Sequence, residues 1–272
     1  MPKIIDSWYS EEDGPVCNIS PIIMLNVLQS MGASKQRVRS LKARANLCKS
    51  ISLALGIKCL KGWKFLSYLG SGSNGTVFSI QNRRGKIRAA KIVTINPGSE
   101  VRVQKRLAKL NIAPKVYSSC KIADRTWVVV MEKIDGSLGD LIGGTKSLSK
   151  RMLKLIYKEI IRTVETMEAD NISHGDLSLE NLGYVVLPDK SIRVVIIDFG
   201  WSGRYVKMFD MVSLMQALLY TKNTENRDFL YEKFAKYIHR KHKFKMPINI
   251  IGMDTLFRDF QKKFIDELRS SL

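Results

Sequence analysis

The sequence predicts an α+β protein with a strand-rich part at about residues 61–131 and a helical part at about residues 132–272. Short β-branched runs separated by turn residues recur up to Met131, which is the pattern of strands. Beyond Met131, apolar residues recur every three or four positions, which is the pattern of amphipathic helices. The same helical spacing within residues 1–60 predicts a basic helical N-terminal extension that precedes a domain at 61–272.

The extension is predicted mainly from one apolar stripe, with basic residues at the positions between its members. The stripe consists of Val38, Leu41, Ala45, Cys48, Ser52 and Leu55. Pro21 followed by four apolar residues suggests an earlier, shorter helix. We expect these helices to pack against the following domain, and a separate binding module is the alternative.

In the strand-rich part, strands are predicted at Lys64–Leu69, Thr76–Ile80, Lys86–Ile95 and Trp127–Met131, with a turn at Asn82–Gly85. Ser99 can cap a helix that reaches Leu110, because Pro114 lies beyond its end. This order predicts a sheet with one helix inserted between its strands.

The helical part begins after Met131 and contains one long amphipathic segment, Ser149–Ala169. Two strands interrupt the helices, Tyr184–Leu187 and Arg193–Ile197, on either side of a turn at Pro188. Helices are then expected to continue to the C-terminus.

The formal net charge of +20 predicts attraction to polyanions through a long-range field. Residues 14–99 carry 14 Lys and Arg and no acidic residue, and Lys236–Lys245 adds a dense basic patch. An acidic protein or a nucleic acid is therefore a possible partner of the basic surface, although such runs are usually solvated faces. No zinc-finger or RNA-recognition signature supports specific nucleic-acid binding.

The sequence predicts no transmembrane segment, because no apolar run approaches the roughly 18 residues that a bilayer requires. Met1–Ser10 lacks the layout of a signal peptide, so an intracellular protein of the cytoplasm or nucleus is expected. The four cysteines are widely spaced and contain no C-x-x-C pair, which indicates neither a zinc site nor a disulfide framework. Buried, reduced thiols are the expectation.

Three motifs follow one another along the chain: Gly70-Ser71-Gly72-Ser73-Asn74-Gly75, His174-Gly175-Asp176, and Asp198-Phe199-Gly200. The glycine motif lies between two predicted strands, whereas a dinucleotide-binding motif would open a helix. In order and spacing the three motifs resemble those of the protein-kinase superfamily. The resemblance covers about residues 63–220 and implies a bilobal protein-kinase-like fold, with an N-lobe at about 61–131 and a C-lobe at about 132–272.

The resemblance implies ATP and Mg²⁺ as cofactors. Glycines allow backbone amides to approach phosphates, and Lys91 ends a strand with the Ala-x-Lys pattern. No acidic residue lies between Asp13 and Glu100, which leaves Glu100 as the expected partner of Lys91. The implied nucleotide-binding residues are Gly70, Gly72, Gly75, Val77, Ala89, Lys91, Glu100, Met131, Glu132 and Ile134, with Met131 as gatekeeper and the backbone of Glu132 and Ile134 facing adenine.

The resemblance also implies catalytic and metal-binding roles for residues of the second and third motifs. By this resemblance Asp176 corresponds to the catalytic aspartate, and Lys91 is the second residue expected to be catalytic. Asn181 and Asp198 are the implied magnesium ligands, because oxygen ligands suit a hard cation. His174 is expected to be a structural hydrogen-bonding residue, and Asp210 to anchor the backbone of the catalytic segment.

The sequence departs from the usual pattern of the family at several positions. Gly175 replaces an arginine that would pair with an activation-loop phosphate, and Ser178 replaces a lysine near the γ-phosphate. Gly183 stands where the family commonly has an apolar residue beneath the adenine, which suggests a roomier or differently lined nucleotide pocket. Asp210 follows Asp198 by only 12 positions, and no Ala-Pro-Glu motif occurs, so the usual activation segment cannot fit.

In these features the chain resembles atypical members, among them RIO-type kinases and the small kinases associated with tRNA modification. The expected function is an ATP- and Mg²⁺-dependent protein serine/threonine kinase with a protein substrate. The alternatives are an aminoglycoside-type small-molecule phosphotransferase and a nucleic-acid-binding kinase-fold scaffold without turnover. The compact core is also similar to kinases of large DNA viruses, for which a virion or viral factory would be the location.

Overall fold

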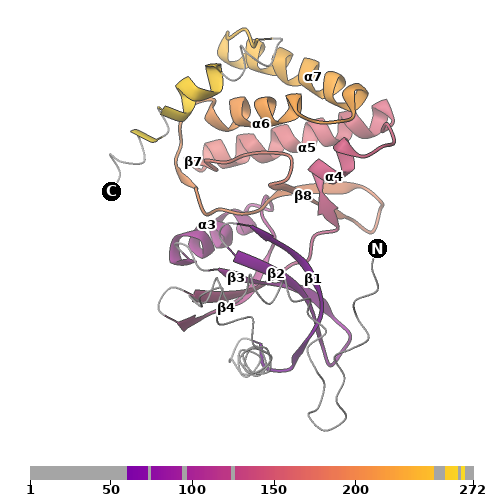
Figure 1. Ribbon diagram of the computed structural model, residues 1–272, viewed down its shortest axis with the longest axis vertical. Coiled ribbons are helices and arrows are strands. Elements are labelled where there is room, and N and C mark those ends of the chain that lie inside the picture. Colours follow the sequence, from indigo (N-terminus) through magenta and orange to yellow (C-terminus); the bar gives the residue numbers. More distant parts are fainter. Residues whose placement is uncertain are drawn as a thin grey trace, which may run out of the picture. The chain divides into compact units, whose positions relative to one another are not determined.

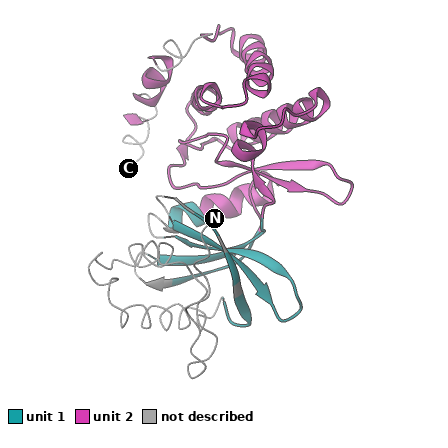
Figure 2. Cartoon of the chain, turned by 45° about the vertical axis from the view of Figure 1, so that its right-hand side comes forward, with its two compact units in different colours: residues 1–101, 116–133 teal, residues 102–115, 134–272 magenta. Residues whose placement is uncertain are grey.

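The computed structural model describes residues 60–72, 75–93, 97–123, 126–247, 255–262 and 265–266. The chain divides into two compact units, residues 1–101 with 116–133 and residues 102–115 with 134–272 (Figure 2). The predicted N-terminal extension lies outside the described residues, apart from Leu60. Within the part of the chain that is described, no helix is both long and apolar enough to cross a membrane.

Unit 1 contains a five-stranded antiparallel sheet with the strand order β1-β2-β3-β5-β4 (Figure 1). The strands are β1 (Trp63–Gly72), β2 (Gly75–Asn82), β3 (Ile87–Val93), β4 (Val116–Ala123) and β5 (Thr126–Met131). The central position of β3 and β5 agrees with their burial, since nearly every side chain from Ala89 to Val93 and from Val128 to Met131 is buried.

Strand β4 was not expected from the sequence. Among the described strands it lies at the edge of the sheet and pairs with β5 alone, and its polar residues Ser118 and Ser119 are half-buried and interrupt the apolar alternation. Cys120 on this strand is disulfide-bonded, so the expectation of reduced thiols is wrong at this position.

Helix α3 spans Pro97–Lys109, with Glu100 in its first turn and Arg106 and Lys109 in its last turn. These charges complement the helix dipole at both ends. In unit 1, Val101 of this helix packs into a small apolar core with Val93 of β3 and Val129 and Met131 of β5. The first turn of α3 is thereby fixed against β3, which brings Glu100 to Lys91.

Unit 2 is mainly helical. Besides residues 102–109 of α3 and a helical segment at 255–262, it contains α4 (Leu138–Gly143), α5 (Lys150–Ala169), α6 (Phe209–Leu219) and α7 (Thr224–His242). Its strands are β6 (Gly136–Ser137), β7 (Ile172–Ser173), β8 (Leu182–Val186), β9 (Ile192–Ile196) and β10 (Gly203–Arg204). Strand β8 pairs with both β6 and β9, and β10 pairs with β7. Helices α5, α6 and α7 lie side by side (Figure 1).

The core of unit 2 forms where the apolar face of α5 meets the other helices and the β8–β9 hairpin. The side chain of Ser149 accepts a hydrogen bond from the backbone of Met152, which caps α5 at the predicted position. The predicted α+β class, with a strand-rich part followed by a helical part, is confirmed.

Candidate active site

The predicted ion pair between Lys91 and Glu100 is present in unit 1. Lys91 Nζ donates to Glu100 Oε1 at 2.6 Å, and the two side chains are only 9% and 2% exposed. Lys91 lies in the middle of β3, where it pairs with Val77 of β2 and Val129 of β5. The carboxylate therefore fixes the direction of an ammonium group that the sheet already holds in place.

The glycines of the first motif have different surroundings. Gly70 and Gly72 lie on β1 and Gly75 on β2, and Ser73 and Asn74 between them are outside the described residues. A Cβ atom at Gly75 would lie 2.0 Å from the carbonyl oxygen of Ile92, whereas one at Gly70 would meet nothing within 4 Å. Gly75 is thus required by the close pairing of β2 with β3, which the sequence did not indicate.

The other predicted residues of unit 1 lie on its strands or directly after them. Val77 packs against the small core that contains Ala89 and Met131, and Ala89 of β3 pairs with Met131 of β5. Glu132 follows β5 directly and is half-buried.

In unit 2, the buried carboxylate of Asp210 holds the backbone of His174 and Gly175, which belong to the second motif. Asp210 accepts hydrogen bonds from the backbone N–H groups of His174 at 2.9 Å and Gly175 at 3.1 Å. Gly175 has φ +85°, a conformation in which a side chain would be strained. Burial raises the pKa of Asp210, and His174 and the two backbone donors oppose this rise. The predicted anchoring contact is therefore present.

His174 is fully engaged in structural hydrogen bonds. Its Nδ1 accepts from the backbone N–H of Asp176 at 3.3 Å, and its Nε2 lies 2.9 Å from the carbonyl oxygen of Ile197. Because Nδ1 is the acceptor of one contact, Nε2 is the ring nitrogen that donates to the carbonyl oxygen of Ile197. The ring also packs edge-on against Phe199, with 5.6 Å between the centroids. His174 thus connects the second motif to the third, as a structural residue.

Asp176 and Asn181 are held together by the amide of Asn181. Its Nδ2 donates to the backbone oxygen of Asp176 at 2.8 Å and to the Oδ2 atom of Asp176 at 3.2 Å. The amide oxygen of Asn181 is the acceptor that remains for a cation. Asp176 itself is exposed, which leaves its carboxylate accessible to a substrate.

Asp198 follows β9 and has φ +64°, in the left-handed region that Asp and Asn adopt more readily than most residues. The backbone N–H of the preceding Ile197 donates to the carbonyl oxygen of Asn181 at 2.9 Å. Phe199, on the other side, is buried. The two predicted metal ligands, Asn181 and Asp198, therefore belong to segments that hydrogen-bond to each other.

The space beside Gly183 is filled rather than empty. A Cβ atom at Gly183 would lie 2.8 Å from Cδ1 of Ile134 and 3.4 Å from Cγ2 of Val195. Of the two possibilities left open by the sequence, a roomier pocket or a different lining, this packing supports the different lining. Ile134, predicted only for its backbone, also contributes its side chain here.

Ser173 is a site-supporting residue that the sequence analysis missed. Its hydroxyl accepts from the backbone N–H of Val206 at 2.9 Å, and it stands in β7, which pairs with β10. The segment after Phe199 is thereby tied to the segment that precedes Asp176, the predicted catalytic residue. In the sequence, the only indication of this role was the position of Ser173 directly before His-Gly-Asp. A small polar residue is common at such positions, so the sequence did not point to a structural role.

We expect Asp210→Ala to destabilise the protein by about 2–6 kcal/mol, because one buried and one part-buried N–H group lose their acceptor at about 1–3 kcal/mol each. Urea unfolding of the full chain measures this. Glu225→Ala is the control, since Glu225 is an exposed acid in the first turn of another helix, α7, and its loss should cost less than 1 kcal/mol. Equal effects of both substitutions would contradict the anchoring role.

The fold of the two units and the contacts within each define a protein kinase domain. A profile of the protein kinase domain matches residues 63–223, which is more than half of the chain, and the chain belongs to this family. The predicted resemblance is thus confirmed.

Curated relatives agree with this assignment. Mitogen-activated protein kinase kinase 10 of Arabidopsis thaliana is 31% identical over 153 residues, which cover 54% of this chain and 48% of that protein. A probable serine/threonine-protein kinase of Fowlpox virus is 24% identical over 176 residues, covering 55% of this chain and 59% of the viral protein. A probable serine/threonine-protein kinase of Dictyostelium discoideum is 27% identical over 156 residues, covering 52% and 26%. The chain spans only about a quarter to three fifths of the length of these relatives.

Proposed function

We propose that this chain is an ATP- and Mg²⁺-dependent protein serine/threonine kinase that lacks a usual activation segment. The observation that carries this proposal is the buried Lys91–Glu100 pair. A buried ion pair contributes little to stability compared with apolar packing. Its position, from the middle of β3 to the first turn of α3, is the position in which the kinase family orients a lysine toward the α- and β-phosphates.

The residues of unit 2 fit the metal that such a kinase uses. Asn181 and Asp198 offer an amide oxygen and a carboxylate, which are ligands that Mg²⁺ accepts, and we propose that they hold it. Bound Mg²⁺ would neutralise charge on the phosphates of ATP. The exposed carboxylate of Asp176 would orient the acceptor hydroxyl and take its proton, with its own position fixed by Asn181 and by the backbone contacts to Asp210.

The short segment between Phe199 and α6 supports the proposed lack of a usual activation segment. Only residues 200–208 lie between Phe199 and the helix, and Gly203–Arg204 within them pair with β7. The backbone N–H of Tyr205 donates to the carbonyl oxygen of Asn171. Gly175 stands where an arginine would pair with an activation-loop phosphate, so phosphorylation of this segment would have no partner there.

The test is a transfer assay with the full chain, Mg-ATP and a cell lysate, in which phosphorylated products are identified by mass spectrometry. Phosphoserine and phosphothreonine in proteins are the expected products. Transfer to small molecules alone would support the phosphotransferase alternative instead. ATP binding without any transfer, together with DNA binding that weakens steeply as salt rises, would support the scaffold.

We expect Lys91→Ala to reduce transfer by about 10²–10³-fold, because a positioned charge beside the phosphates is lost. Glu100→Ala should reduce transfer less, by about tenfold, because the lysine remains but its direction is no longer fixed. Steady-state kinetics of both variants and of the double variant measure these losses. A Glu100→Ala variant with unchanged activity, beside an inactive Lys91→Ala variant, would show that the pair has no role in ATP binding.

A further inference from the structure

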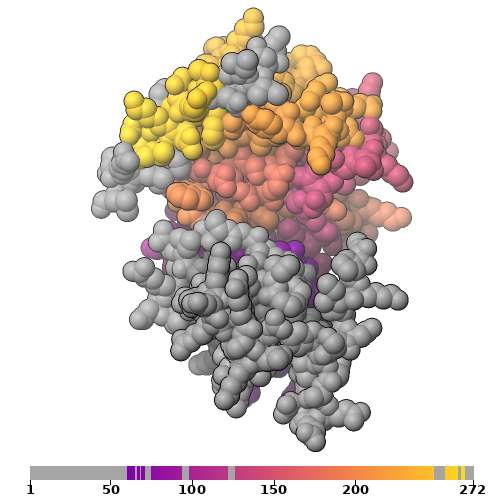
Figure 3. Space-filling view, in the orientation of Figure 1, coloured from indigo at the N-terminus to yellow at the C-terminus, as the bar shows by residue number. Residues whose placement is uncertain are grey.

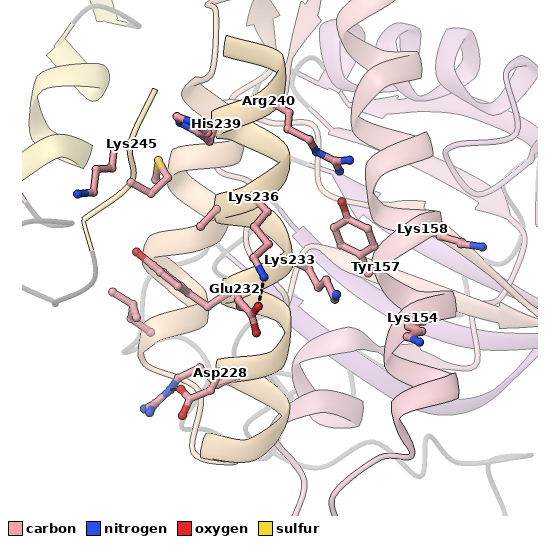
Figure 4. A pocket seen from close by; sticks show the side chains of 15 residues that line it. Lys154, Tyr157, Lys158, Asp228, Glu232, Lys233, Lys236, His239, Arg240 and Lys245 are labelled. Atoms are coloured by element: carbon pink, nitrogen blue, oxygen red, sulfur yellow. Dashed lines mark hydrogen bonds and ion pairs between the residues drawn. The ribbon is translucent and has the colours of Figure 1, made fainter. Parts of the chain in front are cut away.

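A basic groove lies in unit 2 between α5 and α7, and its volume is about 1320 Å³ (Figure 4). Lys154 and Lys158 line it from α5, and Lys233, Lys236 and Arg240 line it from α7, with Lys245 after the end of α7. Helix α7 forms part of the surface that is drawn in orange in Figure 3. We call this feature the α5–α7 groove.

The charges of the α5–α7 groove are unbalanced. Its two carboxylates, Asp228 and Glu232, are already paired with groove cations, Arg227 at 2.8 Å and Lys236. Within the described part of the chain, no carboxylate pairs with the other cations, which are Lys154, Lys158, Lys233, Arg240 and Lys245. A concave surface with this excess of positive charge concentrates anionic groups.

The floor of the groove is apolar. It is formed by Leu219, Ala235 and Met246 and by the rings of Tyr157 and Tyr231. Tyr157 packs against Phe234 with 5.3 Å between the ring centroids, and the hydroxyl of Tyr231 donates to the carbonyl oxygen of Pro247. Because contacts within the protein hold both rings, the floor offers apolar packing more than open ring faces for base stacking.

The spacing of the cations suits an extended peptide. Lys154 and Lys158 are four residues apart on α5, a rise of about 6 Å, and the α7 cations that pair with no carboxylate, Lys233 and Arg240, are seven residues apart, a rise of about 10.5 Å. Side chains on one face of an extended peptide recur about every 6.6 Å. Carboxylates at alternate positions of such a peptide can therefore meet Lys154 and Lys158 in turn, while the side chains between them face the floor. The rise from Lys233 to Arg240 corresponds to about three residues of an extended peptide.

We propose that the α5–α7 groove binds an extended acidic segment of a partner protein in which acidic and apolar residues alternate. Charge complementarity with the cations that pair with no carboxylate selects the acidic residues, and the apolar floor selects the residues between them. Binding here requires none of the residues assigned to phosphoryl transfer, so it does not depend on turnover.

The experiment measures binding of a short fluorescent peptide in which Glu alternates with Val, by anisotropy with the full chain. Lys233→Glu with Arg240→Glu changes one wall of the groove, and Lys154→Glu with Lys158→Glu changes the other. Each double variant should weaken binding by about tenfold or more. The control, Lys86→Glu with Lys146→Glu, causes the same change in net charge at exposed residues outside the groove and should leave binding within about twofold.

Circular dichroism and basal transfer to a peptide without acidic residues should be the same for all variants. Equal weakening by the control pair would show attraction by net charge alone and overturn the proposal. Equal binding of the peptide with Gln in place of Glu would overturn the role of the cations. Tighter binding of single-stranded DNA, lost in the groove variants, would assign the groove to nucleic acid instead.

Discussion

Asp198→Asn is expected to remove nearly all Mg²⁺-dependent transfer, with a loss of at least about 10²-fold, because it deletes a charge that the metal requires. The fold should remain intact. Asp198 has φ +64°, and Asn accepts this left-handed conformation as readily as Asp does. Transfer rates measured with magnesium as the only divalent cation, together with thermal unfolding, test both halves of this expectation.

A matched control is available for Asp198→Asn. Asp189 is an exposed carboxylate in the turn between β8 and β9, where it accepts from the backbone and hydroxyl of Ser191. Asp189→Asn removes the same charge from unit 2 and should leave transfer unchanged. Near-normal activity of Asp198→Asn with magnesium would mean that Asp198 is not a metal ligand.

Asp176→Ala should lower turnover by about 10²–10⁴-fold, the usual contribution of a positioned general base. The affinity for ATP should change little, because the proposed ATP-binding residues are the glycines, Lys91, the segment after β5 and the metal ligands. Single-turnover kinetics and nucleotide binding separate these two quantities.

The structure also predicts a secondary effect of Asp176→Ala, because Nδ2 of Asn181 loses one of its two acceptors and keeps the backbone oxygen. Asn181 should therefore remain in place, and stability should fall by no more than about 1 kcal/mol. A variant that binds no nucleotide, or that unfolds, would identify Asp176 as a structural residue.

The Lys91–Glu100 contact could be predicted from the sequence for an unusual reason. The absence of acidic residues from 14 to 99 left Glu100 as the evident partner, and the structure places the two atoms 2.6 Å apart. The anchoring role of Asp210 was likewise predictable from its motif. Their roles in binding and transfer remain proposals.

Other features could not be predicted, because they depend on which strands become neighbours. The need for glycine at position 75 arises from the carbonyl oxygen of Ile92 on the next strand, and register is not visible in a local sequence pattern. The filling of space beside Gly183 by Ile134 depends on a contact between residues 49 positions apart. Strand β4 was missed because an edge strand does not need a continuous apolar pattern.

The pairing of β10 with β7 has a consequence for how the proposed kinase would be controlled in time. The backbone of residues 203–206 is tied to residues 171–173 at several points, which are the β10–β7 pairs and the bonds from Tyr205 and Val206. Residues 203–206 are thus already ordered without any added phosphate. Such an enzyme would be ready to act as soon as it has folded, and its output would be governed by the amount synthesised and by its encounters with substrates.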